Sequence, residues 1–327
     1  MTEIKHSVIV ITYNQEDLLP AALNSLFSQP VLPYEIIIGD DCSTDGTWDV
    51  IQTFYKQYPQ IIKPIRHSHN LGIFQNINTL KPLPTGDIVS ILAGDDFYEP
   101  GIFETFNEII LKNQIDLNND FIIISNTASI YPNGKRTIYD NTPYKDLDLF
   151  KVKIRYGLDF RETGFSAHLF KSLDDIPLNL GYHADWLFAI DQIVKAKQFY
   201  FINKVFPVYR SGIGVATKTK YQIMQQSRID VINQIKEKYK TLLATDDLTF
   251  LEFEQNICQL SLGKKAVSML KFISLLKKLG EDTYITKQQY NELKRTFLLT
   301  YRNYLLEKLH LYTTLKKIKN LIKHSKA

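Results

Sequence analysis

Cysteine and long hydrophobic runs are scarce in this chain of 327 residues. Its two cysteines, Cys42 and Cys258, are too few and too far apart for a disulfide framework or a cysteine metal cluster, so a reducing, cytoplasmic setting is expected. No stretch approaches the ~18 apolar residues that a membrane-spanning helix needs. The apolar run at residues 8–11 is too short for the core of a signal peptide. We therefore expect neither a secretory leader nor a membrane span.

The composition is otherwise that of an ordinary folded protein. The hydrophobic share is 44%, and the length suffices for one large domain or two modest ones. The formal net charge of +4 is mild. Beyond about Thr217, Gly and Pro nearly vanish, while Leu, Ile, Lys, Gln and Glu dominate. This change of composition predicts an all-helical C-terminal region.

The first hundred residues alternate between strand and helix patterns. Runs typical of buried strands lie at residues 6–12, 34–38, 61–66 and 88–92, and helical patterns lie at 18–27, 47–58, up to Asn78, and at 102–112. Short connections between such elements predict parallel strands joined by right-handed crossovers. The loops that follow these strands should then meet at the carboxyl edge of the sheet. They carry Tyr13-Asn14, Asp40-Asp41, Asn70 to Gly72, and Asp95-Asp96.

Two adjacent carboxylates follow the strand at residues 88–92. Asp95 and Asp96 come directly after Ala93-Gly94. Neighbouring carboxylates repel each other unless a cation joins them, and Mg²⁺ or Mn²⁺ takes oxygen ligands that it commonly shares with substrate phosphates. The pair therefore indicates a metal-bound diphosphate, and an acidic turn that caps the next helix is the alternative.

The rest of the chain adds further elements. A helix is predicted at residues 186–195, and a hairpin at 128–131 and 136–139 around the turn at 132–135. Strands are predicted at 121–125, 165–170 and 205–209.

Four segments, in this order and spacing, resemble the nucleotide-binding half of family 2 glycosyltransferases, which have the GT-A fold. They read SVIVITYNQEDLLPAALNSLFSQ, EIIIGDDCSTDGT, NLGIFQN and GDIVSILAGDDFYEP, and the most specific match lies at residues 37–47. The resemblance implies an α/β, Rossmann-like fold with a mostly parallel central sheet and helices on both faces. It places a catalytic domain at 1–216, with nucleotide-sugar binding at 1–100 and the acceptor side at 101–216. The helical C-terminal region then covers 217–327.

The resemblance also implies the residues that bind the donor, a nucleotide-diphosphate sugar and most commonly a UDP-sugar. Asp41 would accept a hydrogen bond from the base, which suits an ionised carboxylate. Asp95 and Asp96 match the family's metal motif, which implies Mn²⁺ or Mg²⁺. Ala93 stands where an aspartate is usual, so weaker nucleotide binding is expected without loss of the metal. The donor-binding set is Thr12, Tyr13, Asn14, Glu16, Asp41, Asn70, Gly72 and Asp95.

The family's reaction is a single in-line displacement that inverts the anomeric carbon. A carboxylate removes the proton of the acceptor hydroxyl, and the metal stabilises the departing nucleotide diphosphate. Asp185 in Asp185-Trp186 matches the family's base, and Asp191 in the same helix is a second candidate with poorer spacing. Arg210 matches a residue at the end of the family's domain. Two roles for it stay open, a contact with phosphate and a structural ion pair.

The end of the chain is basic and amphipathic. Apolar residues recur at helical intervals from Leu298 to Ile322 beside many lysines, opposed by Glu292 and Glu307. A helix of this kind can lie peripherally on the inner face of an anionic membrane. Packing against the catalytic domain or against a second subunit in a homodimer is the alternative. Nucleic acid is not an expected partner, because no binding module accompanies the charge.

The sequence thus predicts an inverting hexosyl- or N-acetylhexosaminyltransferase that acts on a glycan or lipid-linked glycan in cell-surface polysaccharide biosynthesis. Two alternatives stay open. A non-catalytic sugar-nucleotide or glycan-binding protein of the same fold is one, because Ala93, Gln75 and Ser211 depart from the family pattern. A sugar-1-phosphate nucleotidyltransferase is the other, disfavoured because residues 8–14 contain no glycine. A dehydrogenase is disfavoured because no G-x-G-x-x-G follows the first strand.

Overall fold

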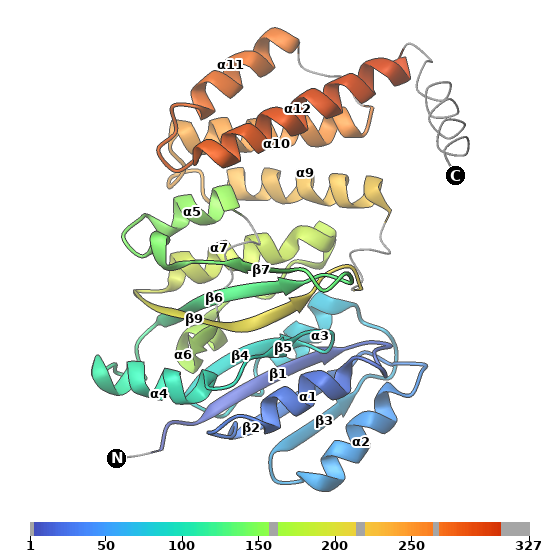
Figure 1. Ribbon diagram of the computed structural model, residues 1–327, viewed down its shortest axis with the longest axis vertical. Coiled ribbons are helices and arrows are strands. Elements are labelled where there is room, and N and C mark those ends of the chain that lie inside the picture. Colours follow the sequence, from blue (N-terminus) through green and yellow to red (C-terminus); the bar gives the residue numbers. More distant parts are fainter. Residues whose placement is uncertain (1–2, 157–162, 214–219, 264–267, 309–327) are drawn as a thin grey trace. The chain divides into compact units, whose positions relative to one another are not determined.

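The computed structural model describes residues 3–156, 163–213, 220–263 and 268–308. The chain divides into two compact units. The first, the α/β unit, comprises Met1–Asn179 and Ala184–Lys218, and the second, the helical unit, comprises Leu180–His183 and Thr219–Ala327 (Figure 1).

The α/β unit is built on a mixed sheet. Its strands are β1 (His6–Thr12), β2 (Glu35–Asp40), β3 (Ile62–Arg66), β4 (Ile88–Ala93), β5 (Phe97–Tyr98), β6 (Phe121–Ile130), β7 (Arg136–Tyr139), β8 (Gly164–Ser166) and β9 (Gln198–Arg210). Within the described residues these nine strands form one sheet in the order β3-β2-β1-β4-β8-β6-β9-β5, and β7 pairs with β6.

Strand direction decides which loops share an edge of this sheet. β1 is parallel to β2 and β4, and β2 is parallel to β3. β8 is antiparallel to both β4 and β6, so β4 and β6 run the same way, and β9 is parallel to β6. The carboxyl ends of β1, β2, β3, β4, β6 and β9 therefore lie at one edge.

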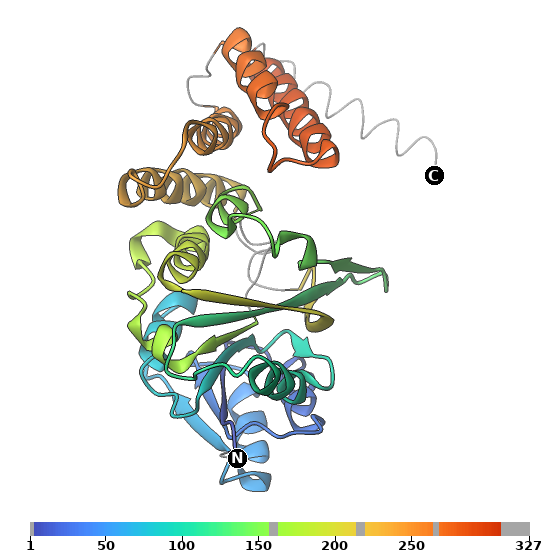
Figure 2. The same ribbon diagram turned by 90° about the vertical axis from the view of Figure 1, so that its left-hand side faces the viewer.

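Helices cover both faces of the sheet (Figure 2). Because strand side chains alternate between faces, Val8 and Val10 join the core formed with α1, α2 and α4. Gly39 faces α3 on the other side, where a Cβ atom would lie 2.3 Å from Asn76 Oδ1, so a larger residue would force the side chain of Asn76 to move. The helices are α1 (Leu19–Phe27), α2 (Thr47–Gln57), α3 (Ile73–Leu80), α4 (Ile102–Lys112), α5 (Leu149–Tyr156), α6 (Ala167–Ser172) and α7 (Ala184–Lys195).

The predicted fold class is confirmed, with one local error. The first four strands are parallel, helices lie on both faces, and the described C-terminal residues are helical. The predicted strand at residues 165–170 is wrong, because β8 ends at Ser166 and α6 follows. Ser166 Oγ accepts the N–H of Leu169 at 3.3 Å, which caps the new helix.

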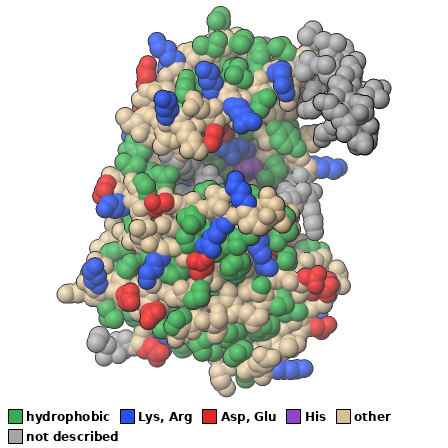
Figure 3. Space-filling view, viewed as in Figure 1, with side chains coloured by type: hydrophobic (Ala, Val, Ile, Leu, Met, Phe, Trp, Pro, Cys, Tyr) green, Lys and Arg blue, Asp and Glu red, His purple; other side chains and the backbone are tan. Residues whose placement is uncertain are grey.

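The helical unit contains α9 (Tyr221–Lys238), α10 (Thr245–Ser261), α11 (Met269–Leu279) and α12 (Lys287–Lys308). Aromatic rings form its core: Phe272 stacks on Phe297 with centroids 4.6 Å apart and meets Phe253 edge-on at 6.0 Å. Lys and Arg side chains are spread over the face of this unit seen in Figure 3. Among the described helices, none is both long enough and apolar enough to cross a bilayer. The predicted amphipathic pattern beyond residue 308 lies outside the described residues.

Acid should weaken the α/β unit through His6, at the start of β1. His6 is 2% exposed, its Nε2 lies 2.8 Å from Asn107 Oδ1, and its ring stacks on Phe103. Burial lowers the pKa of His6 from 6.5 to about 4, against smaller opposing effects of Asn107 and Asp87. As the pH falls below 6.5, His6 binds a proton in the unfolded chain but stays neutral in the folded chain. The free energy of unfolding should therefore drop by about 2 kcal/mol between about pH 7 and pH 5.

Urea unfolding of the parent and of His6→Gln at both pH values measures this effect. Both tryptophans, Trp48 and Trp186, belong to the α/β unit, so their fluorescence reports its unfolding. The parent should lose more stability on acidification than His6→Gln does. An equal loss in the two proteins would contradict the assignment to His6.

Candidate active site

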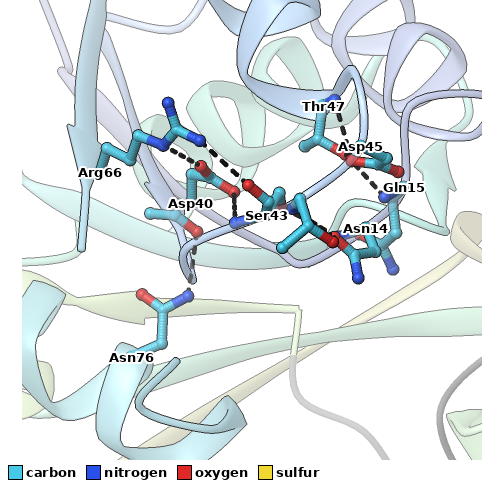
Figure 4. Close-up of polar contacts among 10 residues, drawn as sticks. Asn14, Gln15, Asp40, Ser43, Asp45, Thr47, Arg66 and Asn76 are labelled. Carbon is cyan, nitrogen blue, oxygen red and sulfur yellow. Dashed lines mark hydrogen bonds and ion pairs between the residues drawn. The ribbon is translucent and has the colours of Figure 1, made fainter. Parts of the chain in front are cut away.

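The loop after β1 and the acidic loop after β2 are joined by hydrogen bonds (Figure 4). Asn14, in the left-handed region with φ of 51°, donates its N–H to Ser43 Oγ at 2.9 Å. Its Oδ1 accepts the N–H of Thr44 at 2.8 Å. The N–H of Gln15 binds Thr47 Oγ1 at 2.7 Å. The two loops therefore form one surface at the carboxyl edge.

Glu16 and Asp45 complete this junction. Glu16 Oε2 accepts the N–H of Gly46 at 2.6 Å, so this predicted donor-binding carboxylate supports the neighbouring loop. Asp45 accepts the N–H and the hydroxyl of Thr47 at the start of α2, at 3.0 and 2.6 Å. Burial alone would raise the pKa of Asp45, but these bonds and one from the N–H of Glu16 outweigh it and lower that pKa.

Asp41 binds the loop that follows β3. Its side chain is buried, with 3% of the residue exposed. Oδ1 accepts the N–H of Leu71 at 2.6 Å, and Oδ2 accepts that of Gly72 at 2.8 Å. Gly72 has φ of 82°, which favours glycine, and its N–H also binds Asn70 Oδ1 at 3.1 Å. Each carboxylate oxygen of Asp41 can accept a second bond, so its predicted contact with a base stays a prediction.

Arg66 is a neighbour of the acidic loop that the sequence analysis missed. Its Nε lies 3.3 Å from Oδ2 of the fully buried Asp40, and its Nη2 donates to the carbonyl of Ser43 at 3.0 Å. The guanidinium also lies over the ring of Trp48, 5.3 Å from its centre. A signal was available, because Asp40 and Arg66 end two adjacent parallel strands and are in register.

Arg210, the last residue of β9, holds the loop that carries Asp95 and Asp96. Its backbone N–H donates to Asp96 Oδ1 at 2.9 Å, and its Nε donates to the carbonyl oxygen of Asp95. Its Nη2 donates to the carbonyl oxygen of Leu18, the last residue of the first loop, at 2.8 Å. Burial lowers the pKa of Arg210, while the charges of Asp96 and Asp95 act in the opposite direction. This geometry favours a structural role for Arg210 over a phosphate contact.

The loop after β4 also packs directly on the first loop. A Cβ atom on Gly94 would lie 2.5 Å from Gln15 Oε1 and 2.9 Å from Thr12 Oγ1, so the position has no room for a side chain. Thr12 is 4% exposed and donates to Gln15 at 2.8 Å, whereas Tyr13 is 38% exposed. The structure therefore links the predicted residues of all four loops at one edge of the sheet, and we name residues 12–18, 41–46, 67–72 and 94–96 the edge loops.

Asp95 has the properties of a cation ligand. Within the described part of the chain its carboxylate accepts no hydrogen bond and forms no ion pair, and the residue is partly exposed. The same residues contain no cluster of three or more His, Cys, Asp or Glu side chains suited to a metal. Asp95 and Asp96 offer oxygen donors alone, which suit Mg²⁺ or Mn²⁺ when phosphates or water complete the shell. Asp95 and Asp96 therefore suit a divalent cation that is shared with phosphate oxygens.

Asp185 lies in the first turn of α7 and is partly exposed. Because α7 ends at Lys195, just before β9 begins at the amino edge, its first turn points toward the carboxyl edge that carries the edge loops. Asp185 Oδ1 accepts the N–H of Trp186 at 2.9 Å. Asp191 is 5% exposed within the same helix, which makes it less accessible to an acceptor.

An α/β sheet with linked polar loops at its carboxyl edge defines a class of proteins that bind ligands at that edge. Residues 7–176 match the model of glycosyl transferase family 2. This match covers more than half of the chain, and the chain belongs to that family.

Two curated relatives that align over most of this chain are longer than it. Poly(ribitol-phosphate) beta-glucosyltransferase of Bacillus spizizenii is 25% identical over 245 residues, which are 71% of this chain and 37% of that protein. Poly(ribitol-phosphate) beta-N-acetylglucosaminyltransferase TarS of Staphylococcus aureus (strain Mu50) is 22% identical over 259 residues, 75% of this chain and 44% of TarS. The chain therefore spans less than half the length of these two relatives.

Solved structures share the fold. S. aureus TarS 1-349 in complex with UDP matches with a TM-score of 0.60 and 18% identity, over 92% of this chain and 90% of that one. The mannosyltransferase PcManGT from Pyrobaculum calidifontis, in complex with GDP-Man and Mn²⁺, matches with a TM-score of 0.51 and 17% identity, over 97% and 87%. The predicted GT-A-type fold is thereby confirmed.

Proposed function

We propose that this chain is an inverting glycosyltransferase that moves a sugar from a UDP-sugar to a hydroxyl of a glycan or lipid-linked glycan in cell-surface polysaccharide biosynthesis. The observation that carries the proposal is the linkage of the edge loops around Asp95, whose carboxylate accepts no hydrogen bond from a described residue. Membership of the family supports glycosyl transfer. The TarS complex with UDP supports UDP as the nucleotide of the donor. The poly(ribitol-phosphate) relatives support a surface polymer as acceptor.

The donor would lie along the edge loops. Tyr13 and Asn14 are exposed and placed to meet the nucleoside, and Asn70 lies on the adjacent loop that Asp41 fixes. Asp95 and Asp96 would hold Mn²⁺ or Mg²⁺. Such an ion, when bound, supplies positive charge that stabilises the departing nucleoside diphosphate. Arg210 holds this pair through its backbone N–H, which donates to Asp96 Oδ1, and through its Nε, which donates to the carbonyl oxygen of Asp95.

Asp185 is proposed as the general base. One of its carboxylate oxygens takes the proton of the acceptor hydroxyl as that oxygen attacks the anomeric carbon. The bond from the anomeric carbon to the diphosphate oxygen breaks in the same step, and the electron pair leaves with the nucleoside diphosphate. Attack from the face opposite the leaving group inverts the configuration of the sugar.

A donor screen tests this function. Melting of the full chain is followed with UDP-, GDP- and dTDP-sugars, each with and without Mn²⁺. A UDP-sugar with Mn²⁺ should stabilise the folded chain by about 2.7 kcal/mol at a hundredfold excess over Kd, and the other bases should stabilise it less. A larger shift in melting temperature with a GDP-sugar would make that sugar nucleotide the donor in place of the UDP-sugar. No shift with any of these compounds would contradict the proposal.

Turnover separates an enzyme from a binding protein of the same fold. With the preferred donor and a poly(ribitol-phosphate) acceptor, release of UDP should rise above the rate without acceptor. A donor that raises the melting temperature but is never consumed, with this or other glycan acceptors, would favour the non-catalytic alternative.

A further inference from the structure

Helix α11 in the helical unit carries two apolar faces. One face packs inward, because Phe272, Leu275, Leu276 and Leu279 are buried. The other face points to solvent: Leu270 is 79% exposed, Ile273 is 50% exposed and Met269 is 44% exposed. Large aliphatic side chains that are this exposed on one helix face indicate a surface that binds an apolar partner.

A groove with an apolar lining continues this face toward α12. Its volume is about 770 Å³, and Ile273, Leu276, Phe297 and Leu298 are among the side chains that line it. On α12, Leu298 is 50% exposed and Leu299 is 41% exposed. We call these exposed side chains of α11 and α12, together with the groove, the apolar patch.

Lysines surround the apolar patch. Lys277, Lys287 and Lys294 line the groove, with Glu281 as the acidic residue among its lining. None of these three lysines forms an ion pair with a described residue, whereas Lys271, on the same helix, pairs with Glu252 at 2.5 Å. Hydrophobic and basic side chains lie next to one another over α11 and α12 in Figure 3. The patch therefore combines open apolar area with uncompensated positive charge.

The positive charge around the apolar patch disfavours a positively charged binding partner. Residues 309–327 contain lysines and no Asp or Glu, so this segment of the chain would place like charges against the three lysines. A second copy of the same face would do so as well. An occupant with an apolar interior and an anionic surface meets both features.

We propose that the apolar patch docks the protein on the surface of a bilayer that contains anionic phospholipid. Leu270, Ile273 and Met269 enter the boundary between headgroups and acyl chains, and the lysines pair with lipid phosphates. This inference is independent of the proposed transfer reaction, since none of its residues belongs to the edge loops or to α7.

Vesicle sedimentation with the full chain tests the proposal. Vesicles of phosphatidylcholine with phosphatidylglycerol should bind the protein, and vesicles of phosphatidylcholine alone should bind it much more weakly. The double variant Leu270→Glu, Ile273→Glu should lower the partition coefficient at least about tenfold, as expected when two buried aliphatic side chains are lost. Lys277→Gln with Lys294→Gln should weaken binding and reduce its dependence on salt between about 0.05 M and 0.5 M NaCl.

Matched controls keep the result specific. Leu242→Glu changes a leucine of the same unit that is 50% exposed, and Lys240→Gln removes an exposed charge nearby; both should bind vesicles as the parent does. All of these positions are exposed, so melting temperatures should stay unchanged. Full binding by the Leu270→Glu, Ile273→Glu variant would overturn the proposal. So would lipid-free self-association that this variant abolishes, because a second copy would then occupy the patch.

An Asp95→Asn variant separates this proposal from the proposed function. It should bind vesicles as the parent does. Leu270→Glu, Ile273→Glu should in turn release UDP at the parental rate with a water-soluble acceptor.

Discussion

Replacing Asp95 with asparagine should reduce the release of nucleoside diphosphate by about a thousandfold or more. The amide has no charge to hold the cation, and the charge stabilisation that the cation gives the leaving diphosphate amounts to several kcal/mol. Stability should hardly change, because the Asp95 carboxylate has no hydrogen-bond partner among the described residues. The two readouts together distinguish loss of chemistry from loss of fold.

The measurement is a coupled assay of diphosphate release over a range of Mn²⁺ concentrations, with melting temperatures in parallel. Asp49→Asn is the matched control, since Asp49 is an exposed aspartate of α2 that lies outside the edge loops. It should keep parental activity. The Asp95 variant should also lose the part of the donor-induced stabilisation that depends on Mn²⁺. Activity within tenfold of the parent would show that Asp95 does not hold an essential ion.

Replacing Asp185 with asparagine should lower kcat by about a hundredfold to ten-thousandfold, which is the usual contribution of a general base. Donor binding should persist, because Asp185 lies in the first turn of α7 and not in the edge loops that are proposed to bind the donor. The Mn²⁺-dependent thermal shift with the donor should therefore match that of the parent.

Asp191→Asn is the informative comparison for the base. Asp191 is buried in α7, so its variant should change stability more than kcat. A variant of Asp191 that melts like the parent but has lost turnover, beside an active Asp185→Asn, would move the base to Asp191. Loss of donor binding in Asp185→Asn would instead assign this residue to the donor site.

The parallel strands and the position of their loops were predictable, because each depends on a local pattern. Runs such as residues 6–12 are buried on both sides, and polar residues end each run, so the parallel direction of these strands follows from the short connections. The strand predicted at residues 165–170 failed for a local reason as well. Its apolar composition suits a strand or a helix, and the hydroxyl of Ser166 decides in favour of the helix.

The use of polar side chains within the site was not predictable from local pattern. Asp41 and Glu16 match a donor-binding motif, yet both carboxylates accept backbone N–H groups of neighbouring loops. These partners lie about thirty residues away along the chain. Which acceptor meets which N–H depends on how the loops pack, and that is fixed only in the folded sheet.

The hydrogen bonds of Arg210 affect which sequence changes the loop with Asp95 and Asp96 can accept. The guanidinium binds carbonyl oxygens of Asp95 and Leu18, and a carbonyl is present whatever side chain a residue bears. A substitution at Ala93 therefore removes neither of these two bonds. Ala93 can therefore stand where an aspartate is usual in the family while these two bonds still hold the loop.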